Sequence, residues 1–188
     1  MNKGFEVIEA HWLYGIGYDN IDVVVHPQSI IHSLVEFKDT SIIAQLGFPN
    51  MKIPIQYALS YPKRLNLNEK KLNLAEIKNL SFEKPDFDKF PCLKYAYNAG
   101  KTGGTMGAAL NAANEIAVYA FLDNKIKFLD IPRIINRAMD SHTTIKNPNL
   151  SQILDADKKT KEEAKEAIES NDYYHKNRSQ VSYSALKG

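Results

Sequence analysis

The second half of the chain contains one long stretch that constrains the fold more than any other feature. Between residues 106 and 122 the apolar side chains recur three and four positions apart, which places them along one side of a helix. This apolar stripe consists of Leu110, Ala113, Ile116, Ala117, Ala120 and Phe121. Thr105 precedes the stripe as a candidate N-cap. The pattern predicts a core-facing helix over residues 106–122.

Three more helices are expected around this one. Their segments and end signals are 92–99 with Gly100 as C-cap, 130–139 opened by Asp130 and Pro132, and 157–168 opened near Asp157. Residues 87–170 are therefore expected to form a C-terminal helical bundle domain. Residues 171–188 show no periodicity, and we expect a flexible tail there.

The first 60 residues have a different character. Apolar residues at helical spacing predict a helix over 5–14, and Pro54 predicts another up to about residue 60. Strands are expected at 21–25, 30–37 and 41–46, the last two joined as a hairpin through 38–40. The fold class is thus an incomplete α/β domain with a mixed sheet over 1–60. A polar, lysine-rich extended linker over 61–86 connects it to the all-α part.

The composition excludes several classes of protein. The chain is 44% hydrophobic and 24% charged, which is typical of a globular protein. Its net charge of +2 predicts no nucleic-acid partner, and no run of about 18 apolar residues exists to span a membrane. Cys92 is the only cysteine, so it is expected to be a small buried residue rather than a nucleophile. We expect a cytoplasmic protein, because no internal disulfide is possible and no signal peptide is recognisable.

Charged residues gather at the start of the first helix. The free backbone N–H groups of a helix N-terminus, with Lys3 alongside, make a reasonable phosphate site. Asn2 and Glu6 lie four residues apart and share a face, and Glu9 follows one turn later. Two such carboxylates can hold a divalent cation when a third ligand comes from elsewhere. The alternative is a solvated helix start, where acidic residues are favoured anyway.

Two further groups of residues could carry chemistry. His26 and His32 flank a strand that should be partly buried, where a histidine can shuttle a proton or orient a ligand. The alternative is a pair of structural, hydrogen-bonded histidines. Pro49 and Met51 lie in a loop that follows a strand, a common place for site residues. Simple packing is the alternative for Met51.

Several longer motifs, in order, resemble the 1-deoxy-D-xylulose 5-phosphate reductoisomerase family. They are MNKGFEVIEA at 1–10, HPQSIIHS at 26–33, AQLG at 44–47, PNM at 49–51, FPCLK at 90–94 and ALNAANE at 109–115. The similarity runs from residue 1 to about residue 168 without a large gap. Motifs of this length in the correct order are far more specific than a lone histidine or carboxylate.

The resemblance implies an enzyme that rearranges 1-deoxy-D-xylulose 5-phosphate and reduces the product with NADPH to 2-C-methyl-D-erythritol 4-phosphate, in the presence of Mg²⁺ or Mn²⁺. It implies that Asn2 and Lys3 bind the sugar phosphate and that Glu6 is a metal ligand that also contacts substrate. His32 matches a histidine near the active site. Pro49 and Met51 match residues that line the pocket beside the substrate and, for Met51, the nicotinamide. A homodimer is implied as well.

The family also has parts that do not match this sequence. Its NADPH-binding domain, with a glycine-rich turn after the first strand, its two other acidic metal ligands and its serine-rich phosphate loop all precede the region of similarity. We therefore expect a C-terminal fragment that is inactive alone. Two alternatives stay open: a non-catalytic dimerisation or assembly fragment, and an unrelated small protein that binds a metal or phosphate.

Overall fold

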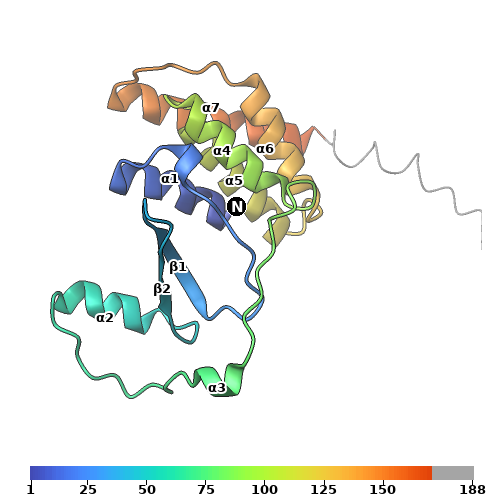
Figure 1. Cartoon of the computed structure of the whole chain (residues 1–188). Coiled ribbons are helices and arrows are strands. Elements are labelled where there is room, and N and C mark those ends of the chain that lie inside the picture. The colour runs from blue at the N-terminus through green and yellow to red at the C-terminus, as the bar shows by residue number, and fades with distance from the viewer. Residues whose placement is uncertain (171–188) are drawn as a thin grey trace, which may run out of the picture. The chain divides into compact units, whose positions relative to one another are not determined.

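A computed structural model describes residues 1–170 as a helix-rich chain with a two-stranded antiparallel sheet (Figure 1). The elements are α1 (Asn2–Tyr14), η1 (Tyr18–Asn20), β1 (Ile31–Glu36), β2 (Ile42–Leu46), α2 (Lys52–Ser60), α3 (Leu74–Ile77), α4 (Pro91–Thr102), α5 (Met106–Leu122), α6 (Asp130–Ser141) and α7 (Leu150–Glu169). The tail expected at 171–188 lies outside the described residues.

The described residues form two compact units. Among the described residues, the first, the helical unit, contains 1–22 and 86–170, and the second, the hairpin unit, contains 23–85. α1 belongs to the helical unit because it packs against α4. The boundary expected at residue 60 therefore does not coincide with a boundary between compact units, and the division into functional domains stays a prediction.

α5 forms the centre of the helical unit and contacts α4, α6 and α7. The helix expected over 106–122 is confirmed with the same bounds. Its buried side chains are mostly alanines, whose small size lets the neighbouring helices approach closely: Ala109, Ala112, Ala113, Ala117 and Ala120. Leu110 and Ile135 fill one core cluster with α4, and Ile134 and Ala164 fill a second one near the other end of α5.

Two expected helix ends were wrong. α4 continues through Gly100 to Thr102 and ends at Gly103, whose φ of 71° is the left-handed conformation that glycine tolerates best. α7 begins at Leu150, not near Asp157, because Asn149 provides a complete capping box with Gln152. Thr105 precedes α5 as expected, but its side chain makes no capping bond.

The hairpin unit is built on β1 and β2. These antiparallel strands confirm the expected hairpin, and its turn places Thr40 at a φ of 70°. The third expected strand, 21–25, is wrong, since Val25 makes only an isolated bridge with Glu83. The sheet is therefore antiparallel and two-stranded rather than mixed.

The segment expected as an extended linker contains the single-turn helix α3, which Asn73 caps through the N–H of Ala75.

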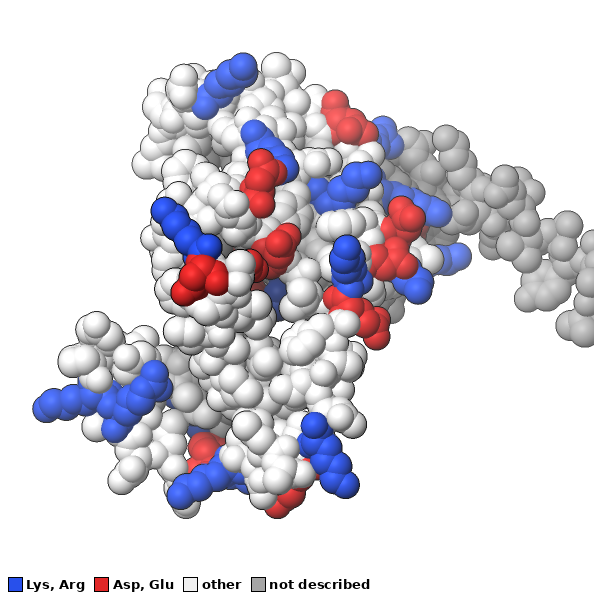
Figure 2. Space-filling model, viewed as in Figure 1, with Lys and Arg blue, Asp and Glu red and all other residues white. Residues whose placement is uncertain are grey.

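In residues 1–170, no helix combines the length and the hydropathy needed to cross a bilayer. Figure 2 shows Lys and Arg side chains interspersed with Asp and Glu over the helical unit. Short-range pairs account for part of this mixture, including Lys161 between Glu115 and Asp157 at 2.9 and 3.1 Å.

Candidate functional site

The first turn of α1 brings three of the expected site residues together. The helix begins at Asn2, so Asn2 and Lys3 lie inside its first turn rather than before it. The Lys3 ammonium forms an ion pair with the Glu6 carboxylate, three residues along the same helix. Both side chains are exposed, at 64% and 52%. An ion pair this exposed contributes little to stability. It can therefore open at little cost, and each charged group can then bind a ligand.

The metal fit of this turn is incomplete within the described residues. Glu6 offers a hard carboxylate of the kind that Mg²⁺ prefers. Residues 1–170 contain no group of three or more His, Cys, Asp or Glu side chains that could hold a metal ion. Glu6 is thus one candidate ligand, not a complete site.

His26 precedes the hairpin strands and has structural contacts. The His26 ring stacks on Phe82, and its Nδ1 lies 2.8 Å from the Ser81 carbonyl oxygen, which can only accept. Gln28 bonds the same serine through its Nε2, 2.8 Å from Ser81 Oγ, and through its Oε1, which accepts from the Ser81 N–H at 3.2 Å. Sequence reasoning missed this role of Gln28, since no local pattern connects residues 28 and 81.

His11 is held within the helical unit. Its Nδ1 lies 2.7 Å from the Ile16 carbonyl oxygen, and its ring stacks on Tyr18 at a centroid distance of 4.2 Å. These contacts fix the turn that follows α1. His11 and His26 thus both have structural partners at Nδ1, whereas His26 Nε2 is buried with no hydrogen-bond partner among the described residues.

His32 differs from those two histidines, because it is exposed and lies at an irregularity of the sheet. Ile31 pairs with Leu46 and Ser33 pairs with Gln45, so two steps along β1 match one step along β2. His32 is the extra residue of this β-bulge. Bulges are over-represented next to active sites, where they re-aim a side chain. No local sequence pattern predicts the bulge, because it depends on the register between the two strands.

Pro49 and Met51 lie in the loop between β2 and α2, and both are exposed. Asn50 anchors the loop by accepting a bond from the Lys52 N–H at 2.9 Å. Lys52 Nζ in turn lies 2.8 Å from Glu69 Oε1, and this bond raises the pKa of Lys52 and lowers the pKa of Glu69. The loop is thus tied to the following segment while Pro49 and Met51 face outward.

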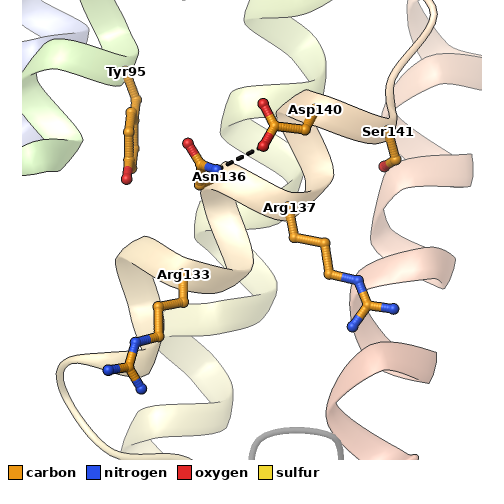
Figure 3. A pocket seen from close by; sticks show the side chains of 6 residues that line it. All are labelled: Tyr95, Arg133, Asn136, Arg137, Asp140 and Ser141. Atoms are coloured by element: carbon orange, nitrogen blue, oxygen red, sulfur yellow. Dashed lines mark hydrogen bonds between the residues drawn. The ribbon is translucent and has the colours of Figure 1, made fainter.

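The helical unit has a hollow of about 530 Å³ (Figure 3). Its lining is Tyr95, Arg133, Asn136, Arg137, Asp140 and Ser141. Asn136 donates to Asp140 at 2.7 Å, and Arg133 pairs with the buried Asp130 at 3.2 Å. These two bonds engage part of the polar lining, and none of the site residues expected from the sequence lines the hollow.

Comparison with known proteins agrees with the motifs. The profile of the DXP reductoisomerase C-terminal domain matches residues 46–163. A 1-deoxy-D-xylulose 5-phosphate reductoisomerase of Desulforamulus reducens is 57% identical over 168 residues, covering 89% of this chain and 43% of that protein. A relative of the same name from Bacillus thuringiensis subsp. konkukian is 56% identical, with 89% and 44% covered. The chain thus spans less than half the length of these relatives.

Solved structures of the same name superpose well. The Zymomonas mobilis enzyme in complex with NADPH gives a TM-score of 0.83 at 42% identity, over 89% of this chain and 44% of that one. A complex with NADPH, fosmidomycin and magnesium gives 0.84 at 44% identity, over 89% and 43%. A profile that matches more than half of the chain, together with these relatives, is decisive. The chain belongs to the DXP reductoisomerase family, and the part it represents is the C-terminal portion.

Proposed function

We propose that this chain is the C-terminal part of an enzyme that converts 1-deoxy-D-xylulose 5-phosphate to 2-C-methyl-D-erythritol 4-phosphate by rearrangement and NADPH-dependent reduction. The observation that carries the proposal is the exposed first turn of α1, where Lys3 and Glu6 meet in a chain of this family. NADPH would bind to the portion of the relatives' length that this chain does not span.

Each site residue has a proposed role. Asn2 and Lys3 bind the substrate, with the Lys3 ammonium close to its phosphate. Glu6 contacts the substrate and supplies one ligand to Mg²⁺ or Mn²⁺, which would polarise substrate oxygens. His32, the extra residue of the bulge, would lie near the substrate as a candidate catalytic group. Pro49 and Met51 line the pocket, with Met51 against the nicotinamide.

The proposed domains keep the sequence-based boundaries. Residues 1–60 complete a catalytic α/β domain, residues 61–86 connect it, and residues 87–170 form a helical bundle. The enzyme would act as a cytoplasmic homodimer. A second candidate function, a non-catalytic dimerisation fragment, is favoured by the exposed apolar side chains of the hairpin, such as Val35 and Ile43.

Turnover separates these functions. The test compares the 188-residue chain with a full-length chimera, in which the N-terminal part of the Desulforamulus reducens relative precedes this chain. We expect NADPH oxidation with 1-deoxy-D-xylulose 5-phosphate from the chimera only, because hydride transfer needs a donor held close to the reacting carbon. The N-terminal part alone serves as control. A chimera that binds NADPH but never turns over contradicts the proposed reaction, and turnover by the short chain contradicts its incompleteness.

A further inference from the structure

One helix of the helical unit, α4, packs against the segment that carries Asn2, Lys3 and Glu6. α4 contacts both α1 and η1, and Figure 1 shows α1 alongside α4. Gly4 and Val7 are buried on the side of α1 that packs into the unit. The position of the first turn of α1 is therefore set by what α4 presents to it.

The closest approach in this contact is between Gly4 and Ala96. A methyl group added at Gly4 would lie 2.5 Å from Ala96 Cβ and 3.5 Å from the Cys92 carbonyl oxygen. Carbon atoms in contact are about 3.5–4.0 Å apart, so α1 would have to move by about 1 Å to admit the methyl group. Ala96 is fully buried, and its Cβ cannot rotate away. The absent side chain of Gly4 thus determines how near the two helices lie.

Asn2 and Glu6 lie on the side of α1 opposite Gly4 and Val7, and Lys3 lies at the flank between the two sides. Successive residues of a helix are about 100° apart around its axis. Asn2, Glu6 and Glu9 therefore point away from the side that holds Gly4 and Val7. A displacement of α1 from α4 moves this outer face by the same amount, with no change in any site residue.

α4 also holds the residues after α1. The Tyr97 hydroxyl donates to the Ile21 carbonyl oxygen at 2.8 Å, and Lys101 pairs with Asp19. Gly100 lies against the Tyr18 ring, and a methyl group there would be 2.4 Å from Cζ. Contacts at both ends of residues 1–22 resist sliding and tilting of α1 along α4.

We propose that α4 positions the substrate-binding turn of α1, with Gly4 and Ala96 as the positioning residues. The proposal rests on the proposed function of Asn2, Lys3 and Glu6. The helical unit would then contribute to substrate binding by holding this turn in position. Neither positioning residue touches the substrate.

A reciprocal pair of substitutions tests the contact in the 188-residue chain. Gly4→Ala should accelerate hydrogen exchange over residues 2–9, although alanine ordinarily favours a helix over glycine. Ala96→Gly makes room for the new methyl group, so the double variant should return toward wild-type exchange. Gly107→Ala is the matched control, since a methyl group there meets nothing within 4 Å and should leave exchange unchanged. If Gly4→Ala alone does not fold, a folded double variant with wild-type exchange supports the same conclusion.

The full-length chimera supplies the functional readout. There Gly4→Ala should lower kcat/KM by roughly 10- to 100-fold, the cost of a misplacement of about 1 Å, and Ala96→Gly should restore most of it. Gly4→Ala with wild-type exchange, or wild-type kinetics in an active chimera, overturns the proposal, as does a double variant no better than Gly4→Ala. An inactive wild-type chimera refutes only the proposed function. The hydrogen-exchange measurements then decide whether α4 determines the position of α1.

Discussion

The proposed metal site needs the negative charge of the Glu6 carboxylate. Glu6→Gln keeps the size of the side chain but removes the anionic ligand, so metal binding should weaken because Mg²⁺ gives up its hydration shell reluctantly. In the full-length chimera we expect most turnover to be lost. Calorimetric titration with Mn²⁺ should show reduced affinity as well. Unchanged kinetics and Mn²⁺ affinity would refute the ligand assignment.

Lys3 should affect a different kinetic constant. Its ammonium is exposed and pairs only with Glu6 in the described contacts, so it is available for a phosphate group. Lys3→Ala in the chimera should mainly raise KM, with a smaller change in kcat. Lys158→Ala, an exposed lysine on α7, is the control and should alter neither constant. An equal effect of both substitutions would contradict a phosphate contact.

His142 makes the folding of the helical unit dependent on pH. Its Nε2 lies 2.8 Å from Oγ1 of the buried Thr105. The same Oγ1 accepts a hydrogen bond from the Ile145 N–H at 3.0 Å. Burial, and to a lesser extent the charge of Lys159, lower the pKa of His142, while Glu163 opposes the shift. The folded chain therefore binds the proton less readily than the unfolded chain does.

The sign of this effect follows from proton linkage. The contribution of His142 is complete above the ordinary histidine pKa of about 6.5, and it is lost as the pH falls from there through the lowered folded pKa. Urea unfolding at pH 7.5 and pH 5.0 should show a loss of stability that is smaller in His142→Gln. The same loss in both proteins would exclude His142 as the source.

At the level of the element, α7 depends on its N-terminal cap. The Asn149 side chain accepts from the Gln152 N–H, and the Gln152 side chain accepts from the Asn149 N–H, both at 2.9 Å. Asn149→Ala should lower the free energy of unfolding by about 1 kcal/mol, measured by urea denaturation. Asn147→Ala, an exposed change in the same loop, is the control. If Asp157 opened the helix instead, Asn149→Ala would have no effect, but Asp157 lies in mid-helix beside Lys161.

For the whole molecule, the hairpin unit determines how the isolated chain behaves. A two-stranded sheet has two unpaired edges, and Val35 and Ile43 on it are 57% and 64% exposed. We expect the chain to self-associate in a concentration series followed by light scattering. Ile43→Lys should reduce the association. Leu122→Lys, at an equally exposed position on α5, should reduce it less. A monodisperse monomer would contradict this expectation.

The sequence alone determined the features that depend on neighbours along the chain. The apolar stripe predicted α5 with its correct ends, because helical periodicity is a local property. The hairpin followed from two apolar runs around a three-residue turn. The ordered motifs identified the family, and the resemblance predicts Asn2, Lys3, Glu6, His32, Pro49 and Met51 as site residues. Of these, the structure brings Lys3 and Glu6 into contact.

Only the tertiary structure decided the features that depend on residues far apart in sequence. Gly100 predicts a helix end, yet α4 continues through it to Thr102. The glycine instead leaves room for the Tyr18 ring, which occupies the space that a side chain would need. Thr105 reads as a cap, yet its hydroxyl bonds the loop after α6. The bulge at His32 and the approach of Gly4 to Ala96 belong to the same class. Local propensity is worth a few tenths of a kcal/mol per residue, so a single buried contact or hydrogen bond of about 1 kcal/mol overrides it.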